Sequence, residues 1–266
     1  MSVAVITGAA SGIGAGLARE AARRGMQVVL ADRDEAALAA VAGEIGAQAL
    51  AVPCDVTDPA ALEALADAAW AAHGQVDLLF ANAGVLATGF SWEIPAETWH
   101  KVIEVNLAGV VNTMRAFVPR LIAADRPARI VNTASVGGFL PSPLMAPYSA
   151  TKFAVVALTE CLAGELKMLG SRVEVSLLAP GPVKTEIFRE PPPEGAAQFH
   201  QYMTALLDQN GLTPDEFAVL VHDGVERGDY WIIPQPESLE PIFSIRNTAI
   251  LAGQFPEYFS AEGQSQ

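Results

Sequence analysis

The chain has 266 residues, of which 51% are hydrophobic and 17% charged, so it carries enough apolar surface for one large folded domain and lacks the composition of a disordered protein. Its 30 acidic and 16 basic residues give a formal net charge of -14. A charge of this sign repels phosphate groups, which argues against nucleic acid and against an anionic membrane surface as partners.

Short apolar runs predict seven strands, at residues 3–7, 28–32, 49–53, 76–81, 128–135, 172–179 and 230–233. Segments with a helical spacing of apolar residues lie between most of them, at residues 13–24, 35–45, 59–72, 97–124, 147–169 and 214–227. The runs are continuously apolar, which is typical of parallel strands buried on both faces. The sequence therefore predicts an α/β fold, a doubly wound, Rossmann-like parallel sheet in a single domain over residues 1–266.

Two segments lack this clear alternation. The pattern weakens over residues 181–212, where Pro191, Pro192 and Pro193 exclude an ordinary helix. We expect residues 184–212 to form a lid after the sixth strand. Residues 234–266 are interrupted by prolines and predict an irregular tail.

The first strand leads into a glycine-rich turn at residues 7–14 (TGAASGIG), and a helix follows. Glycines permit a tight turn and let backbone N–H groups approach a pyrophosphate at the helix N-terminus, where the helix dipole favours negative charge. The alternative is a plain glycine-rich turn, but the position between a strand and a helix favours dinucleotide binding. The residues expected to bind the cofactor here are Gly8, Ser11, Gly12, Ile13 and Gly14.

Asp32 ends the second predicted strand, about 20 residues after the turn, where a carboxylate can accept hydrogen bonds from an adenine-ribose diol. The same carboxylate would repel a 2′-phosphate, so the sequence favours NAD over NADP. Arg33 complicates this choice because its guanidinium could pair with that phosphate or stack on adenine. The alternative is a solvated turn at residues 32–35.

Tyr148 and Lys152 lie four residues apart on one predicted helix and therefore on one face. A nearby ammonium favours the phenolate, which would bring the pKa of Tyr148 from about 10 towards a range useful for general acid/base catalysis. Ser135 follows the fifth strand, at the carboxyl edge where ligands bind in open α/β sheets. Tyr-x-x-x-Lys spacings are common by chance, so the pair indicates a catalytic site only together with Ser135 at the edge of the sheet.

The order and spacing of these residues resemble the short-chain dehydrogenase/reductases, in their single-domain branch. The resemblance covers residues 3–233. The matching motifs are residues 7–14, Asn82-Ala83-Gly84, Asn106, Ser135, residues 148–152 (YSATK) and Pro180-Gly181.

The resemblance implies a catalytic role for four residues. Tyr148 would give or take the proton, Ser135 would hydrogen-bond the reacting oxygen, and Lys152 would hold the nicotinamide ribose and lower the pKa of Tyr148. Asn106 would position a proton-relay water. These roles agree with the chemistry, because hydride transfer to a ketone leaves negative charge on oxygen that two hydroxyl donors stabilise.

The resemblance also implies further cofactor contacts around the same edge. They are Asp55 and Val56 at the adenine, Asn82, Ala83 and Gly84 along the cofactor, and Pro180, Gly181, Val183 and Thr185 around the nicotinamide amide and phosphates. Asp55 can also be read as a turn or cap residue before the third helix. The triplet 81–83 (ANA) departs from the two asparagines frequent in the family, which changes local hydrogen bonding.

Three segments, residues 85–94, 136–146 and 184–210, should overhang the active site, with few charges at its mouth. Their large apolar side chains favour an apolar secondary alcohol or ketone as substrate, although each could simply pack the lid. These side chains are Phe90, Trp92, Phe139, Leu140, Leu144, Met145, Phe188, Phe199, Tyr202, Met203 and Leu206.

Other functions remain open beside this one. A reductase of ketoacyl groups on a carrier protein usually needs NADPH and a basic docking patch, and the acidic balance of the chain counts against it. A nucleotide-sugar epimerase or dehydratase generally needs a larger substrate domain. A non-catalytic, dinucleotide-binding regulatory protein would not need Ser135, Tyr148 and Lys152.

The predicted helix at residues 147–169 is apolar on nearly all sides, which favours a homodimer or homotetramer. The two cysteines, at least one of them in an expected buried helix, cannot form a disulfide framework and predict a cytoplasmic protein. The four histidines are scattered and predicted to lie at the surface or at helix ends, so no metal site is expected.

Overall fold

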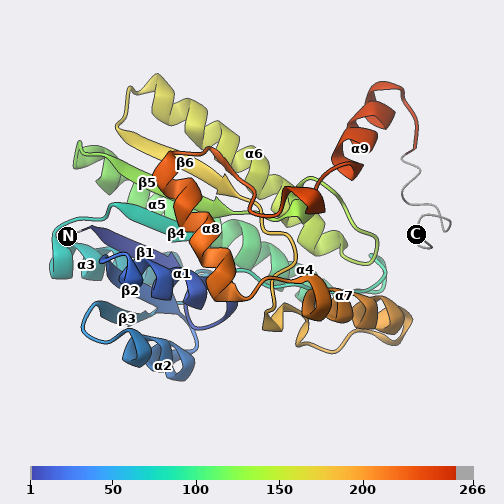
Figure 1. The fold of residues 1–266 in the computed structure, drawn as a ribbon, viewed down its shortest axis with the longest axis horizontal. Coiled ribbons are helices and arrows are strands. Elements are labelled where there is room, and N and C mark those ends of the chain that lie inside the picture. The colour runs from blue at the N-terminus through green and yellow to red at the C-terminus, as the bar shows by residue number, and fades with distance from the viewer. Residues whose placement is uncertain (1, 256–266) are drawn as a thin grey trace.

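A computed structural model describes residues 2–255, and a seven-stranded sheet forms its centre (Figure 1). All strand pairs are parallel, in the order β3-β2-β1-β4-β5-β6-β7. All seven predicted strands and the doubly wound sheet are confirmed. The strands are β1 (Val3–Thr7), β2 (Gln27–Asp32), β3 (Ala49–Pro53), β4 (Leu78–Ala81), β5 (Ala128–Thr133), β6 (Val173–Leu178) and β7 (Trp231–Ile232).

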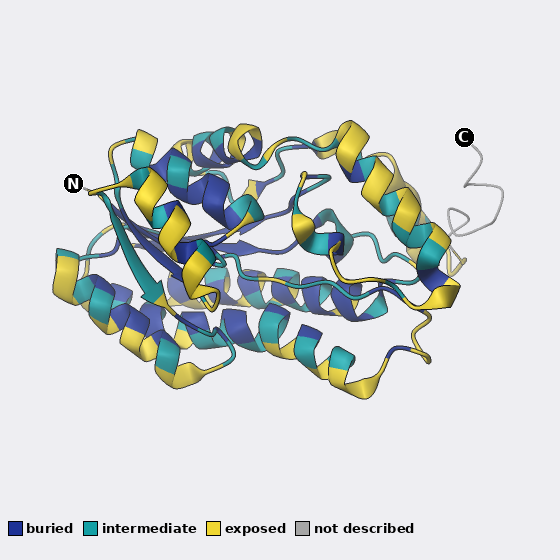
Figure 2. Ribbon diagram, turned by 90° about the horizontal axis from the view of Figure 1, so that it is seen from below, coloured by how far each residue is buried: buried dark blue, intermediate teal, exposed yellow. Residues whose placement is uncertain are grey.

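The continuously apolar strands are explained by two helical layers, one on each face of the sheet (Figure 2). In β1, Val3 and Val5 pack into one core cluster, whereas Ala4 and Ile6 pack into the other. Because alternate residues of a strand point to opposite faces, a sheet covered on both sides needs apolar residues at every position. The first cluster contains residues of α3 (Pro59–His73), α5 (Gly109–Ala123) and α6 (Ala146–Met168), and the second contains residues of α1 (Gly12–Arg23), α2 (Glu35–Ile45) and α8 (Pro214–Arg227).

Local signals explain where several helices begin. The Asp34 carboxylate accepts from the backbone N–H of Ala37 at the start of α2, and Asp58 caps α3 in the same way. At the start of α8, Thr213 and Glu216 form a reciprocal capping box. These polar caps satisfy N–H groups that have no partner within the helix.

The helix predicted at residues 97–124 is continuous but not regular. It consists of α4 (Ala96–Ile103), a π-helical segment over Glu104–Ala108, and α5. Asn106 lies within the π-helical segment and is fully buried. Such segments often occur at functional sites, and this one turns a polar side chain towards the sheet edge.

The lid segment contains a helix that the prolines led us not to expect. After β6 the chain leaves the sheet, and a bridge between Val183 and Leu212 closes the base of the segment. Helix α7 (Ala197–Asn210) lies inside it, so the prediction of no ordinary helix is wrong beyond residue 196. The three prolines precede α7 and do not interrupt it. Within α7 the large apolar side chains have helical spacing, at Phe199, Tyr202, Met203, Leu206 and Leu207.

The tail is likewise more ordered than predicted. A 3₁₀ turn at Pro236–Ser238 and helix α9 (Ile242–Leu251) follow β7, so the prediction of an irregular tail is wrong for this part. None of the residues of α9 is buried. Residues 256–266 of the predicted tail lie outside the described residues.

Three polar side chains differ from their predicted environments. His222, expected near the surface, is buried on α8, and one of its ring nitrogens lies 3.1 Å from the Leu17 carbonyl oxygen. Cys161 lies on α6 but is exposed, and the buried thiol is that of Cys54, outside any helix. Over residues 2–255, we find no helix with both the length and the apolar character needed to cross a membrane.

Candidate active site

A cavity of about 810 Å³ opens at the carboxyl edge of the sheet, where β1 and β4 lie side by side and the strand order reverses. This is the switch point at which ligands bind in doubly wound sheets, and the volume suits a ligand of cofactor size. Every site residue predicted from the sequence lines the cavity except Asn106. The structure thus brings together residues from the first glycine turn to Thr185.

The glycine turn forms the floor of the cavity next to the N-terminus of α1. Gly8 and Gly12 have φ angles of 68° and 51°, a region that residues with a side chain rarely adopt. A Cβ on Gly14 would lie 2.0 Å from the Gly8 carbonyl oxygen. The turn therefore accepts only glycine at these positions, and it leaves backbone N–H groups open to a phosphate, which fits a dinucleotide.

Thr7 fixes the loop after β4 against this turn. Its hydroxyl accepts hydrogen bonds from the backbone N–H groups of Asn82 (2.9 Å) and Ala83 (3.2 Å) and donates to the Phe80 carbonyl. The Asn82 amide donates to the Thr7 carbonyl in return, at 3.0 Å. Residues 82–84 are thus held along the cavity by β1, and the positioning role of Thr7 had no signal in the sequence beyond its place in the glycine motif.

Asp32 and Arg33 lie where the cavity passes the end of β2. The Asp32 carboxylate accepts from the backbone N–H groups of Ala10 and Asp34, each at 3.1 Å. It thereby fixes the glycine turn and is itself held at the cavity rim, while Arg33 is exposed. A fixed carboxylate in this place can accept hydrogen bonds from a ribose diol.

Asp55 does two things that the sequence presented as alternatives. Its carboxylate accepts from the backbone N–H of Thr57 at 2.9 Å and from the Thr57 hydroxyl at 2.8 Å, so it stabilises the turn before α3. The helix cap itself is Asp58. Asp55 also lines the cavity together with Val56, next to the end of β3.

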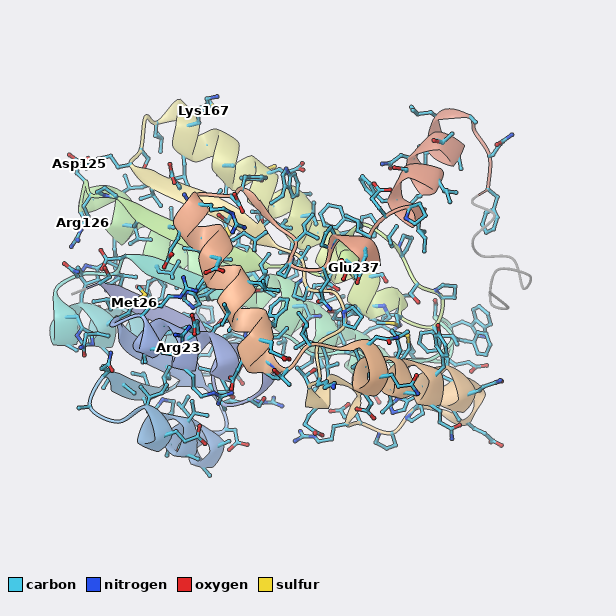
Figure 3. All side chains as sticks on the ribbon, viewed as in Figure 1. Arg23, Met26, Asp125, Arg126, Lys167 and Glu237 are labelled. Atoms are coloured by element: carbon cyan, nitrogen blue, oxygen red, sulfur yellow. The ribbon has the colours of Figure 1, made fainter. Side chains whose placement is uncertain are left out.

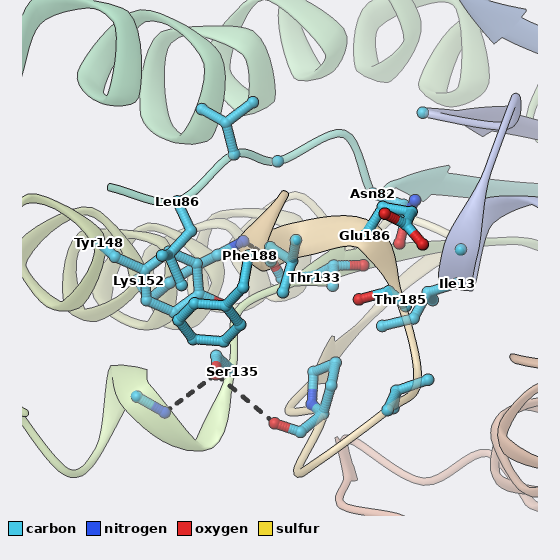
Figure 4. Close-up of a pocket in the computed structure, with 18 of the residues that line it drawn as sticks. Ile13, Asn82, Leu86, Thr133, Ser135, Tyr148, Lys152, Thr185, Glu186 and Phe188 are labelled. Atoms are coloured by element: carbon cyan, nitrogen blue, oxygen red, sulfur yellow. Dashed lines mark hydrogen bonds between the residues drawn. The ribbon is translucent and has the colours of Figure 1, made fainter. Parts of the chain in front are cut away.

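Ser135, Tyr148 and Lys152 are brought to one wall of the cavity by β5 and α6, and all three are buried. The Ser135 hydroxyl accepts from the Gly137 N–H at 3.0 Å and lies 3.5 Å from the Pro180 carbonyl oxygen (Figure 4). The Lys152 ammonium donates to the Thr133 carbonyl at 2.8 Å and lies 5.7 Å from the centre of the Tyr148 ring. The spacing of four residues on α6 is what gives Tyr148 and Lys152 the same face.

Burial dominates the ionisation of this wall. It raises the pKa of the Tyr148 phenol, and hydrogen bonding with Ser135 acts in the opposite direction. Burial also lowers the pKa of Lys152 to about 8. The shift of Tyr148 is thus opposite to the one expected from the Lys152 charge, because loss of water outweighs other effects at a buried phenol.

Asn106 lies behind the cavity wall and holds a loop rather than lining the cavity. Its Oδ1 accepts from the Val85 N–H at 2.8 Å, and its Nδ2 donates to the Val85 carbonyl at 2.9 Å and to the Thr151 hydroxyl at 3.2 Å. These bonds connect the π-helical segment to α6 and to the loop after β4. In this structure its contacts are those of a positioning residue.

An apolar wall lies beside Tyr148. Met145, Tyr148, Phe188 and Leu207 form one buried cluster, with Leu86 packed against it (Figure 4). Of the eleven side chains predicted to overhang the site, five line the cavity: Leu140, Met145, Phe188, Met203 and Leu206. Trp92 and Tyr202 are largely exposed and lie outside it.

Comparison with known proteins places the chain in a family. Residues 2–194 match the model of the short chain dehydrogenases. The chain belongs to the short-chain dehydrogenase/reductase family. It is therefore an oxidoreductase, and the resemblance predicted from its motifs is confirmed.

Individual members of the family match over most of the chain. A 1-deoxy-11-beta-hydroxypentalenate dehydrogenase of Streptomyces exfoliatus is 45% identical over 187 residues, 68% of this chain and 67% of that protein. A CLA biosynthesis dehydrogenase/reductase of Lactiplantibacillus plantarum is 31% identical over 98% of this chain and 97% of that protein. The crystal structure of a short-chain dehydrogenase/reductase from Burkholderia phymatum in complex with NAD has 38% identity and a TM-score of 0.92, covering 96% of each chain.

The cavity of this dehydrogenase has more charged groups at its edge than the sequence predicted. Lys101, Glu186, Arg189, Glu190 and Glu237 all contribute to the lining. The Lys101 ammonium pairs with Glu190 at 2.6 Å, which joins α4 to the lid. Over residues 2–255, no group of three or more His, Cys, Asp or Glu side chains is arranged to bind a metal ion.

Sequence reasoning missed the part of the site that comes from the chain after β7. Gln235, Glu237, Ser238 and Ile242 line the cavity. The segment has no apolar periodicity and no motif that would have identified it. Its contribution depends on contacts with residues about 50 positions earlier, such as the bond from Gln235 to Pro182.

Proposed function

We propose that this protein is an NAD-dependent dehydrogenase that oxidises a bulky, largely apolar secondary alcohol to its ketone, or catalyses the reverse reduction. The observation that carries the proposal is the meeting of Ser135, Tyr148 and Lys152 with the glycine turn in one cavity. Two hydroxyl groups and a cation on one wall are suited to a reaction in which charge develops on an oxygen atom.

NAD, when bound, accepts the hydride from the alcohol carbon. The chain supplies the acid/base chemistry: Tyr148 takes the hydroxyl proton on its phenolate oxygen during oxidation and returns it during reduction. The Ser135 hydroxyl hydrogen-bonds the same substrate oxygen. Lys152, held by the Thr133 carbonyl, stabilises the phenolate form of Tyr148. Asn106 holds the Val85 loop against α6. We propose that it also positions a relay water.

The choice of NAD rather than NADP is supported by the Asp32 carboxylate at the cavity rim and by the similarity to a relative whose structure is a complex with NAD. A 2′-phosphate at this position would meet a negative charge that is held in place by two backbone N–H groups. Arg33 is the opposing influence, because it lines the same part of the cavity.

The choice of substrate is supported by the apolar cluster around Tyr148 and by the similarity to a relative that is named a 1-deoxy-11-beta-hydroxypentalenate dehydrogenase. A bulky alcohol would displace water from Phe188, Met145 and Leu207, which favours binding in proportion to the apolar area covered. A sugar phosphate has little apolar surface, so it would not gain this binding free energy at the same side chains.

The proposal is tested by following NADH and NADPH absorbance with secondary alcohols that range from small aliphatic to aryl and steroid compounds. We expect turnover with NAD, highest for the bulky apolar alcohols. Binding of NADH without turnover of any alcohol would favour the regulatory protein instead. Turnover that depends on a carrier-protein thioester and NADPH would favour the ketoacyl reductase.

We also propose that the protein is a homodimer or homotetramer. Helix α6 exposes a row of small or apolar side chains at helical spacing, namely Ala150, Ala157, Cys161, Gly164 and Met168. Small side chains allow a second helix to approach closely, so a second copy of the chain can pack here. Light scattering of the wild type and of Ala157→Arg tests this assembly, and the variant should be smaller.

A cytoplasmic location is proposed as well. Its support is that Cys54 and Cys161 are both free thiols, as is usual in a reducing compartment. Fractionation of cells that express the protein is the test. Recovery in a membrane or periplasmic fraction would contradict it.

A further inference from the structure

An unpaired hydrogen-bond acceptor lies in the wall of the active-site cavity. Gln235 is 5% exposed, and its Nε2 donates to the Pro182 carbonyl at 2.9 Å. The other atom of the same amide, Oε1, is buried and has no hydrogen-bond partner. A buried acceptor without a partner is costly, and most such groups in proteins are satisfied by a protein group, a water or a ligand. Gln235 lines the cavity, so a ligand that reaches this oxygen through a small movement of the side chain can provide the missing donor.

A second oxygen lies beside it. A Cβ placed on Gly181 would be 2.7 Å from Ser238 Oγ and 3.0 Å from Gln235 Oε1, so both oxygens surround the same point above the Gly181 backbone. Glu237, between them in sequence, also lines the cavity. In Figure 3 it lies on the turn that precedes α9, away from Arg23, Met26 and Lys167. We call Gln235, Glu237 and Ser238 the acceptor wall.

The acceptor wall is connected to Ser135 through residues 180–182. The carbonyl of Pro180 accepts from the backbone N–H of Val136 at 3.0 Å and lies 3.5 Å from the Ser135 hydroxyl. Gly181, which touches the acceptor wall, is the next residue, and Pro182 holds the Gln235 amide. The wall is thus joined to the segment that contacts Ser135, on a different part of the cavity from the glycine turn.

The acceptor wall is also held in a fixed conformation. The backbone N–H of Ser238 donates to the Gln235 carbonyl at 3.0 Å within the 3₁₀ turn, and Leu239 is buried. The Phe243 ring lies edge-on to Phe139, with 5.8 Å between the ring centres. An acceptor that is fixed before the ligand arrives loses little entropy on binding, so it contributes to selectivity.

We propose that the acceptor wall binds a second hydroxyl group of the substrate, one that is not oxidised, through Gln235 Oε1 and Ser238 Oγ. The inference rests on the proposed dehydrogenase function and narrows its substrate class to alcohols that are apolar over most of their surface and carry a second hydroxyl. An amide oxygen can only accept, so the ligand group must be a donor. The apolar cluster around Tyr148 receives the carbon skeleton, and the acceptor wall sets its orientation.

The carboxamide of the nicotinamide is a second kind of donor that this cavity would receive, beside a substrate hydroxyl. The resemblance places that group around residues 180–185, where the Thr185 hydroxyl and the backbone also line the cavity. The experiment therefore has to separate a substrate hydroxyl from the cofactor amide. A change in cofactor affinity distinguishes the two, because only the amide belongs to the cofactor.

The test compares the best alcohol found for the enzyme with its hydroxylated analogues, and compares cyclohexanol with the three cyclohexanediols. The proteins are the wild type, Gln235→Met, which keeps the side-chain length and removes both the acceptor and the donor to Pro182, and Ser238→Ala, which leaves the Gln235 anchor in place. Gln198→Met, on the exposed face of α7 and outside the cavity lining, is the matched control. The measurements are kcat/KM for each alcohol and the Kd of NADH.

We expect wild type and Gln198→Met to prefer one diol over the mono-alcohol by about tenfold, the value of one well-placed hydrogen bond. Gln235→Met and Ser238→Ala should lose most of this preference, because kcat/KM should fall for the diol much more than for the mono-alcohol, and both should bind NADH with unchanged Kd. If Gln235→Met does not fold, Ser238→Ala alone decides the outcome.

Three outcomes contradict the inference. The wild type could show no preference for any diol, the variants could keep the preference, or the Kd of NADH could rise by the same factor as the loss in kcat/KM. In each of these cases the alcohols are still oxidised, so the proposed function survives. Absence of turnover with every alcohol, despite NADH binding, would instead remove the proposed function and this inference with it.

Discussion

The ammonium group of Lys152 lies 5.7 Å from the centre of the Tyr148 ring, and both side chains are buried in the wall of the cavity. Burial raises the pKa of Tyr148 and lowers that of Lys152 to about 8, so burial disfavours the charged form of both groups, although Lys152 still carries its proton at neutral pH. The balance between this desolvation and the attraction of the Lys152 cation determines how much phenolate is present at a given pH.

This balance predicts the pH dependence of alcohol oxidation. Oxidation needs the phenolate of Tyr148, and because the pKa of that phenol is raised, the phenolate population and kcat/KM should increase as the pH rises from about 6. The increase should slow above about pH 8, where Lys152 loses the charge that stabilises the phenolate. Lys152→Met should move the profile to higher pH and reduce kcat/KM about 100-fold. Lys167→Met, at the exposed end of α6, should leave the profile unchanged. An identical profile for Lys152→Met would remove the role of the cation.

Tyr148→Phe should separate binding from chemistry. The ring that packs against Phe188 and Met145 remains, so we expect the Kd of NADH to change by less than about twofold. Turnover should fall by about 1,000-fold because the proton acceptor is lost. Fluorescence titration with NADH and absorbance assays on the same preparation provide both values. Normal turnover of the variant would contradict the mechanism.

Asp32→Ala should reduce the preference for NAD over NADP. The carboxylate is the negative charge that a 2′-phosphate would meet, and its removal leaves Arg33 as the nearest charged group in the cavity lining. We expect the ratio of kcat/KM for the two cofactors to fall at least about tenfold. Asp34→Ala, which removes only the cap of α2, is the control. An unchanged ratio in Asp32→Ala would show that the carboxylate does not select the cofactor.

Phe188 defines how much room a substrate has beside Tyr148. Phe188→Ala removes a ring that packs in the same cluster as Tyr148 and Leu207, so the cavity becomes larger on the side of the lid. We expect kcat/KM for alcohols of moderate size to fall about tenfold or more, since apolar contact is lost, and the fall to be smaller for the bulkiest alcohols. Equal losses across the series would place Phe188 outside the substrate pocket.

The parts of the structure that could be predicted from the sequence are those with strong local patterns. The strands were predicted because burial on both faces requires uninterrupted apolar runs, as in β1 and β5. Ser135, Tyr148 and Lys152 were found because a spacing of four residues on a helix and a position after a strand fix where side chains lie. Both kinds of signal are contained in a few neighbouring residues.

The parts that could not be predicted depend on distant contacts. Gln235 belongs to the cavity through a hydrogen bond to Pro182, 53 residues away in the chain. His222 is polar, but it is buried on α8 together with Phe217 and Val221. In each case tertiary contacts decide the outcome, and the local sequence does not record them.

A partly buried ion-pair network between α1 and α8 gives the last prediction, which concerns stability. The Glu20 carboxylate is 5% exposed and accepts from Arg23 and Arg24, and Arg24 also pairs with Asp223 and Glu226 of α8. Burial alone would raise the pKa of Glu20, but the hydrogen bonds to the two arginines lower it. A carboxyl group whose pKa is lowered on folding stabilises the folded state above its unfolded value, about 4.3, and this contribution is lost as the pH falls below that value.

Arg24→Met should therefore cost about 3 kcal/mol at neutral pH, because it removes the contact that joins the two helices and leaves Glu20 buried with one partner fewer. The cost should shrink between about pH 5 and pH 3, where Glu20 becomes protonated in the variant. Arg227→Met removes an exposed ion pair with Asp229 and should cost less than about 1 kcal/mol at either pH. Urea unfolding of the three proteins at pH 7 and pH 4 measures these differences. Equal losses for Arg24→Met and Arg227→Met would show that the network does not stabilise the packing of α1 against α8.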